Sequence, residues 1–180
     1  MTGALYAAAV DRTSRAAVAS AAKAWTAAAS LPPASREAYL LDALMKIAVV
    51  HGEVSASVST DYLREQLAGD AALATLDTVP TPADGEHLRS SLTWAMQTKT
   101  EGLVDPDRAA AARAYILGVV DKHVRRHGFR HLQRMARDLG TRTHVAPESG
   151  ACGFCLGRIS QGAIPPYHAY CRCAVQLAPE

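Results

Sequence analysis

The sequence predicts a mainly α-helical protein that ends in a small irregular cap. Alanine makes up about a fifth of the 180 residues and aromatic residues only 6%. This composition favours helices, because Ala leads the helix scale whereas aromatic and β-branched residues lead the strand scale. Apolar residues also recur at three- and four-residue steps over long segments. All four cysteines lie after residue 140, so we expect an Ala-rich helical body over 1–140 and a cap over 141–180.

The first half of the body is expected to form two long helices. The first spans about residues 3–30 and carries a thin stripe of small side chains, until 31–33, which reads Leu-Pro-Pro, ends it. The second begins near Ser35 with a broad apolar face. It ends at Gly52 or continues to Leu67, since the apolar pattern extends past the glycine.

Two further helices follow a proline-containing break. The third covers about 86–98, and its candidates for packing are Leu88, Leu92, Trp94 and Met96. The fourth begins at Pro106 with Asp105 as N-cap, and Gly140 ends it. Gly128 lies on the apolar face of this helix, where it marks either close packing or a break.

The cap is expected to contain two short strands, Arg142–Val145 and Ala174–Leu177. No segment of the cap is long enough to build an apolar core of its own. Metal binding can supply the folding energy that such a small unit lacks.

The cap holds cysteines and a histidine at the spacing of a structural zinc site. Cys152 and Cys155 form a Cys-x-x-Cys pair, and His168, Cys171 and Cys173 follow. A Cys-x-x-Cys turn directs two sulfurs to one point, and soft sulfur with imidazole nitrogen suits tetrahedral zinc. Five candidates compete for four places. Spacing from His168 favours Cys171, although an extended segment would point Cys171 and Cys173 the same way. In another arrangement four cysteines bind the metal and His168 lies outside it.

Other states of the four thiols were weighed against zinc. Two disulfides are one alternative, and buried unreactive thiols are another. A redox Cys-x-x-Cys requires a βαβ setting, which the sequence lacks. We expect structural zinc, and four protein ligands would leave no open position for water or substrate.

Charge is unevenly distributed along the chain, although the net charge is only +2. Residues 51–107 carry a net −7, and residues 108–143 a net +7 from nine basic and two acidic side chains. The predicted contact residues for nucleic acid or an acidic partner are Lys122, Arg125, Arg126, Arg130, Arg134 and Arg137. They show no repeated alternation of aromatic and basic residues and no groove-reading motif, so binding is expected to be independent of base sequence. The alternative is that the charged faces pair within a bundle or face water.

The cap motif resembles that of the Mu F-like (MuF) minor capsid proteins of tailed phages, in particular those of actinobacteriophages. The resemblance covers about the last 40 residues, which read Cys-x-x-Cys, a glycine-bearing loop, proline and then His-x-x-Cys-Arg-Cys. An Arg-rich helix is also expected just before this motif, as in that family. It implies a head-morphogenesis protein carried near the portal, with the portal or major capsid protein as partner and packaged DNA as a further contact. The implied location is the virion, and the host cytoplasm during assembly.

The expected function is therefore structural. No nucleophile elbow, HExxH, phosphate-binding loop or carboxylate pair occurs in the sequence. No run of 18 apolar residues occurs either, so no membrane span is expected. The first alternative is an enzyme, either a capsid maturation protease or an encapsidated effector. The second alternative is a zinc-knuckle module that binds nucleic acid. The net charge of zero over residues 144–180 argues against this alternative.

Overall fold

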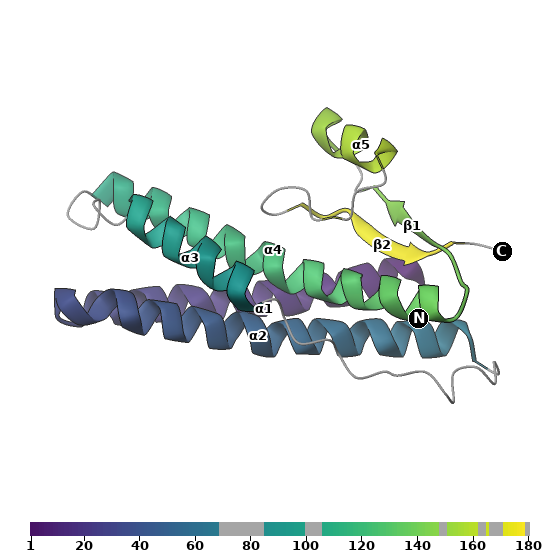
Figure 1. Ribbon diagram of the computed structural model, residues 1–180, viewed down its shortest axis with the longest axis horizontal. Coiled ribbons are helices and arrows are strands. Elements are labelled where there is room, and N and C mark those ends of the chain that lie inside the picture. Colours follow the sequence, from purple (N-terminus) through teal and green to yellow (C-terminus); the bar gives the residue numbers. More distant parts are fainter. Residues whose placement is uncertain (69–84, 100–105, 148–150, 162–164, 166–170, 179–180) are drawn as a thin grey trace.

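The computed structural model describes residues 1–68, 85–99, 106–147, 151–161, 165 and 171–178. Within these ranges the elements are α1 (Gly3–Ala29), α2 (Pro33–Gln66), α3 (Gly85–Lys99), α4 (Pro106–Asp138), β1 (Thr143–Ala146), α5 (Gly153–Ser160) and β2 (Ala174–Leu177). Helices α1, α2 and α4 pack side by side, and α3 lies along the first half of α4 (Figure 1). The mainly α fold class is confirmed, with the short strands in the C-terminal part.

The helix boundaries follow local chemistry. Thr2 caps α1 by accepting a hydrogen bond from the Leu5 backbone N–H at 3.3 Å. Pro33 opens α2, because proline fits the first helical position, where its missing N–H costs nothing. The helix does not end at Gly52, since that residue is buried against His127 of α4. The longer of the two predicted second helices is therefore correct.

The body has two hydrophobic clusters along its length. One joins α1, α2, α3 and α4 and includes Leu44, Leu92 and Val124. The other joins α1, α2, the second half of α4 and β2, and it contains stacked rings of Tyr6 and Tyr62, whose centroids are 4.4 Å apart. Desolvation raises the pKa of the Tyr6 hydroxyl, which forms a hydrogen bond of 2.9 Å with Ser59 Oγ. The second cluster thus ties the last strand into the body.

Gly128 marks close packing rather than a break in α4. A Cβ at this position would lie 2.2 Å from Ser55 Oγ and 2.9 Å from the Ser55 carbonyl oxygen of α2. The Gly128 carbonyl accepts a hydrogen bond from Ser59 Oγ at 2.9 Å. Small residues on α2 and a glycine on α4 therefore allow the two backbones to approach. Gly140, at φ 69°, ends the helix region as predicted.

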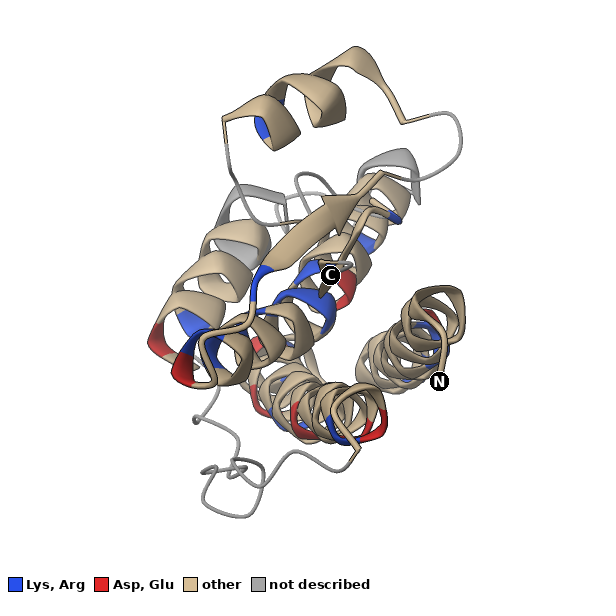
Figure 2. Ribbon diagram, turned by 90° about the vertical axis from the view of Figure 1, so that its right-hand side faces the viewer, with Lys and Arg blue, Asp and Glu red and all other residues tan. Residues whose placement is uncertain are grey.

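The strands pair antiparallel, with Thr143 opposite Leu177 and Ala146 opposite Ala174. Figure 2 looks along the helices and shows α5 above these strands, with the four long helices below them. Helix α5 was not predicted, because the Cys-x-x-Cys segment was expected to be a tight turn. A single eight-residue helix with Gly157 inside it gives little periodic signal.

Two expectations about α3 and α4 have different outcomes. Leu88 and Leu92 are buried as expected, but Trp94 is 51% exposed, so its prediction as a packing residue is wrong. The side chain of Met96 and the N-cap Asp105 lie outside the described residues. None of the helices in the described ranges has the length and apolar character needed to cross a membrane.

Candidate metal centre

Three of the five predicted ligands form a buried sulfur cluster. The Sγ atoms of Cys155, Cys171 and Cys173 all lie within 4.8 Å of one another, and each residue is at most 2% exposed. Val145 of β1 and Ala151 and Ile159 around α5 pack against them. The cluster thus joins elements that are separate in sequence, and three thiols so close together could hold a metal ion.

Each cysteine is positioned by a short element. Cys155 lies in the first turn of α5, and Cys171 and Cys173 precede β2 in an irregular segment. The sulfurs of both residues lie in the cluster, so the structure gives no reason to prefer Cys171 over Cys173 as a ligand. Cys152 is exposed and is the N-cap of α5. Its thiol hydrogen-bonds to that of Cys155, whereas His168 lies outside the described residues.

The geometry fits zinc better than a disulfide. In a tetrahedral site with Zn–S bonds of about 2.3 Å, neighbouring sulfurs lie about 3.8 Å apart. The Sγ atoms of Cys155 and Cys171 are 3.9 Å apart. A disulfide would require about 2.05 Å, and all four cysteines are free thiols in the structure. Cys155, Cys171 and Cys173 would hold the ion, with the fourth ligand from Cys152 or His168.

The cluster is an unfavourable place for unmetallated thiolates. Burial, followed by the hydrogen bond that the Cys155 thiol donates to Cys152 and by the charge of Cys171, raises the pKa of the Cys155 thiol far above its ordinary value. A bound cation would reverse this preference, because it stabilises the deprotonated sulfur directly. The described residues supply three thiol ligands, and a fourth protein ligand would complete the tetrahedral coordination of a structural site.

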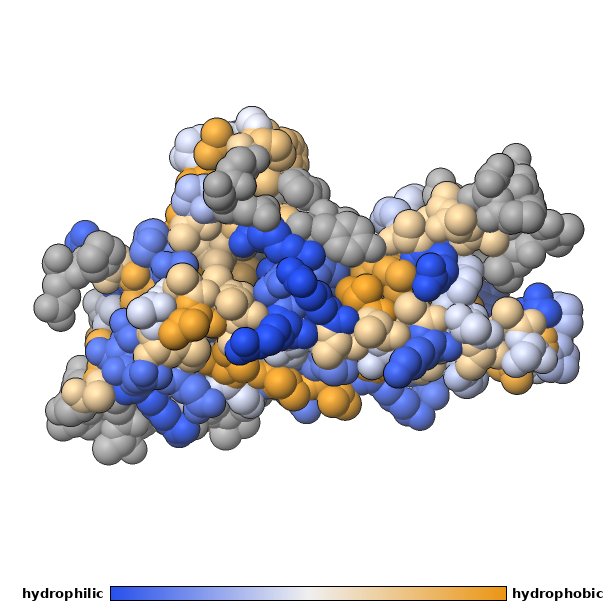
Figure 3. Space-filling model, turned by 180° about the vertical axis from the view of Figure 1, so that it is seen from behind, coloured by the Kyte–Doolittle hydropathy of each residue, from blue (hydrophilic) through white to orange (hydrophobic). Residues whose placement is uncertain are grey.

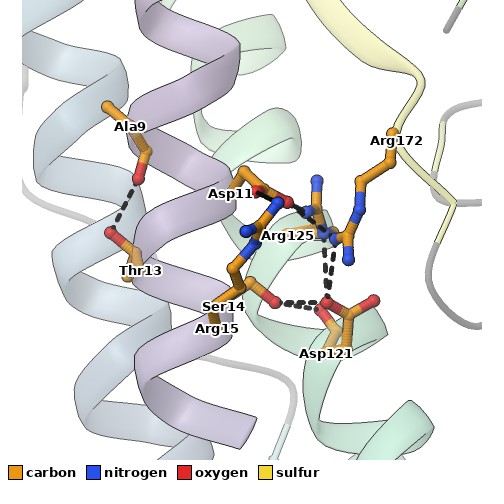
Figure 4. A network of polar contacts seen from close by, with 8 residues as sticks. All are labelled: Ala9, Asp11, Thr13, Ser14, Arg15, Asp121, Arg125 and Arg172. Atoms are coloured by element: carbon orange, nitrogen blue, oxygen red, sulfur yellow. Dashed lines mark hydrogen bonds and ion pairs between the residues drawn. The ribbon is translucent and has the colours of Figure 1, made fainter.

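Arg172, between two of the cysteines, ties the cluster to the helical body. Its guanidinium lies 2.7 Å from Asp11 of α1 and 3.5 Å from Asp121 of α4 (Figure 4). The sulfurs of Cys171 and Cys173 lie in the cluster, whereas the side chain of Arg172 between them reaches the carboxylates of the body. One tripeptide therefore supplies two sulfurs to the cap and one cation to the body.

The carboxylates that receive Arg172 also bind Arg125. Arg125 pairs with Asp11 and, through Nε, with Asp121 at 3.2 Å. Ser14 donates to Asp121 at 2.5 Å. Asp121 and Arg125 are each 1% exposed, so these charges survive burial only because each faces an opposite charge and hydrogen bonds.

The six predicted contact residues on α4 do not form one surface. Arg125 is buried in the ion cluster just described, which makes it a structural residue, and the prediction that it contacts a partner is not supported by its position. Arg130 and Arg137 are exposed, whereas Lys122, Arg126 and Arg134 are partly buried. His131 is buried and hydrogen-bonds to Thr60 at 2.9 Å. The prediction of six contact residues did not distinguish exposed from buried arginines.

Sequence inspection missed the acidic partners Asp11 and Asp121. A signal was present, because each lies within an apolar helix face, next to Val10 and Val120 respectively. A carboxylate on such a face needs a buried cation. The Asp121 to Arg125 spacing of four residues supplied one candidate, but nothing in the sequence indicated Arg172.

The outer surface of the cap is partly apolar. Phe154 and Leu156 of α5 are 59% and 51% exposed. The space-filling view from behind shows hydrophobic residues, in orange, at the surface of the cap (Figure 3). The buried side of α5 is therefore the cysteine side, and apolar side chains are left on its outer side.

Comparison with known families identifies the chain. The model of the VG15 protein family matches residues 3–179, which is almost the whole sequence. The chain belongs to the VG15 protein family. VG15 is a family of phage virion genes, so this is a virion-associated phage protein. Comparison with curated proteins and with solved structures gave no match.

Proposed function

We propose that this VG15 protein is a structural minor capsid protein of the MuF-like type, which docks near the portal during head assembly and is not an enzyme. Two observations support the proposal: membership of a phage virion family, and the cap motif that resembles the MuF proteins. The buried cluster of Cys155, Cys171 and Cys173 carries it, because within the described residues this cluster brings together cysteines of that motif and could hold a metal ion.

Zinc is the proposed ion. Three buried sulfurs within 4.8 Å of one another, two of them 3.9 Å apart, match its preference for thiolate ligands, and a fourth protein ligand would give it a structural role. Zinc bound by these cysteines would cross-link α5 to the segment before β2. The exposed apolar side chains of α5 would then form part of a rigid knob that docks on the portal or the major capsid protein.

Contact with packaged DNA is proposed as a secondary role. The exposed and partly exposed basic residues of α4 supply positive charge, and such contacts with phosphates are independent of sequence. Arg125 is excluded from this role because it is buried between two carboxylates.

Co-purification with the portal protein tests the proposal. The zinc-loaded chain is expected to elute with the portal protein or the major capsid protein on size exclusion and to be present in purified particles. The Cys171→Ser variant is expected to lose this association, and the Arg15→Ala variant, which changes only an exposed side chain, is expected to keep it. Absence of the chain from purified particles, or cleavage of the capsid protein on incubation, would contradict a structural role.

A further inference from the structure

A pocket between α3 and α4 is lined by basic residues and histidines. It has a volume of about 140 Å³, and its lining includes His87, Ser91, Tyr115, Lys122, His123 and Arg126. An adjoining pocket of about 40 Å³ shares three of these residues and adds His127 and Arg130. We call the two together the α3–α4 groove. From Tyr115 to Arg126 it extends about 16 Å along α4.

The electrostatics of this groove suit an anion. Neither lining includes Asp or Glu within the described part of the chain. Burial, followed by the neighbouring charge of Arg126, lowers the pKa of the Lys122 amine. Lys122 and Arg126 therefore place positive charge on a partly desolvated wall of the groove, where it attracts an anionic ligand.

His127 offers a further hydrogen-bonding group in the smaller pocket. Its Nε2 atom is buried and has no hydrogen-bond partner among the described residues. Burial, the largest influence, and Arg130 both lower the pKa of His127, with Glu53 opposing them. A buried nitrogen of this kind is favourable only when a ligand or water satisfies it.

Two exposed aromatic side chains lie at the other end of the groove. Tyr115, which lines it, is 43% exposed, and Trp94 of α3 is 51% exposed. Their ring centroids are 5.4 Å apart. The sequence did not indicate this pair, because Trp94 comes from a different helix than Tyr115. The fold thus places flat apolar rings next to a row of cations.

We propose that the α3–α4 groove binds single-stranded nucleic acid, with phosphates against Lys122 and Arg126 and a base stacked on Tyr115 and Trp94. Cationic grooves with aromatic platforms recognise single strands in this way, because unpaired bases expose faces that a duplex hides. The length of the groove suits a strand rather than one phosphate group. The inference refines the nucleic-acid contact proposed above and is independent of portal docking and of zinc.

Fluorescence anisotropy with the full-length, zinc-loaded protein tests the proposal. A labelled oligothymidylate is expected to bind more tightly than a duplex of equal length, and to quench Trp94 fluorescence. Tyr115→Ala is expected to weaken oligothymidylate binding roughly 5- to 150-fold, the range of one lost base stack. Its matched control is Tyr39→Ala, which removes a similarly exposed ring from α2 and is expected to have no effect.

Charge substitutions provide a second arm. Arg126→Gln is expected to lower the slope of log affinity against log salt by about 0.7, the value for one phosphate of a single strand. Arg113→Gln removes an exposed cation of α4 outside the groove and is expected to leave binding unchanged. Thermal unfolding of each variant checks that the fold persists.

Three results would overturn the assignment. The first is no binding of oligothymidylate at low salt. The second is equal affinity for duplex with no effect of Tyr115→Ala, which indicates only a general electrostatic surface. The third is thymidine monophosphate binding as tightly as the strand, which indicates a site for free nucleotides. None of these results bears on whether the protein is found at the portal.

Discussion

In the helical body, side chains of α1, α2 and α4 cover one another over two extended hydrophobic clusters, whereas the cluster at the heart of the cap consists of three cysteines with Val145, Ala151 and Ile159 around them. The body can be stabilised by buried apolar area alone. The cap has too little of it and requires a cross-link. The two regions meet where β2 packs into the second hydrophobic cluster and where Arg172 reaches the ion cluster of the body.

Replacing a cysteine of the cluster is expected to give the largest difference between the cap, which should lose its structure, and the body, which should keep it. Structural zinc in small domains contributes on the order of 10–16 kcal/mol of apparent binding free energy, so Cys155→Ser is expected to abolish stoichiometric metal and expose the cap to proteolysis. The helical signal in far-UV circular dichroism should change little, because the body does not depend on the sulfurs. Elemental analysis measures the metal content, and mass spectrometry after limited proteolysis locates the cleavage. Stoichiometric metal in this variant would contradict the view that the cap depends on the sulfurs.

Cys152→Ser sharpens the same experiment. Cys152 is exposed, but its thiol hydrogen-bonds to Cys155. Loss of metal in this variant identifies Cys152 as the fourth ligand, and retention of metal identifies His168.

The ion cluster should be the most sensitive polar feature of the body. Arg125→Ala leaves Asp121 buried without its closest cation, and breaking such a pair costs about 3–5 kcal/mol. Arg15→Ala removes another arginine that pairs with Asp11, but Arg15 is 70% exposed, so the expected loss is below about 1 kcal/mol. Urea unfolding measures both, and similar losses in the two variants would refute the structural role of Arg125.

Two glycines compare the packing of the regions directly. Gly128→Ala is expected to destabilise the body by about 1–3 kcal/mol, because its Cβ collides with Ser55. Gly157→Ala in α5 meets no atom of the described chain within 4 Å and should gain up to about 1 kcal/mol from helix propensity. Thermal unfolding gives both signs, and a neutral Gly128→Ala would mean that α2 and α4 do not approach as closely as the structure indicates.

The smallest expected effect is the pH dependence of metal affinity. The raised pKa of Cys155 keeps this thiol protonated near neutral pH in the metal-free protein, so metal binding must release at least one proton. Affinity should therefore rise about tenfold per pH unit and fall as the pH is lowered. Competition with a chromophoric chelator at several pH values measures the slope, and a flat profile would show that the thiols are already ionised.

Much of the fold could be predicted from the sequence because the long helices carry their own period and stops. Gly140 and Pro33 determine helix ends locally. Gly128 could not be assigned from the sequence alone, since its environment depends on Ser55 of α2. Trp94 was misassigned because hydrophobicity indicates what can be buried, not which side of α3 meets a neighbour.

The candidate metal site was predictable to a similar extent. Spacing singled out five candidates that include Cys155, Cys171 and Cys173, but it favoured Cys171 over Cys173, and both sulfurs lie in the cluster. The link from Arg172 to Asp11 was not predictable, since the two residues are almost the whole chain apart and only the packing of α1 against α4 brings Asp11 beside Asp121.

Elemental analysis of the protein, purified without added metal or chelator, tests the role of the cysteine cluster most directly. We expect one zinc per chain, lost together with the structure of the cap when a strong chelator is added. Absence of stoichiometric metal, or a disulfide between Cys155 and Cys171 in the native protein, would contradict a cap built on a metal ion.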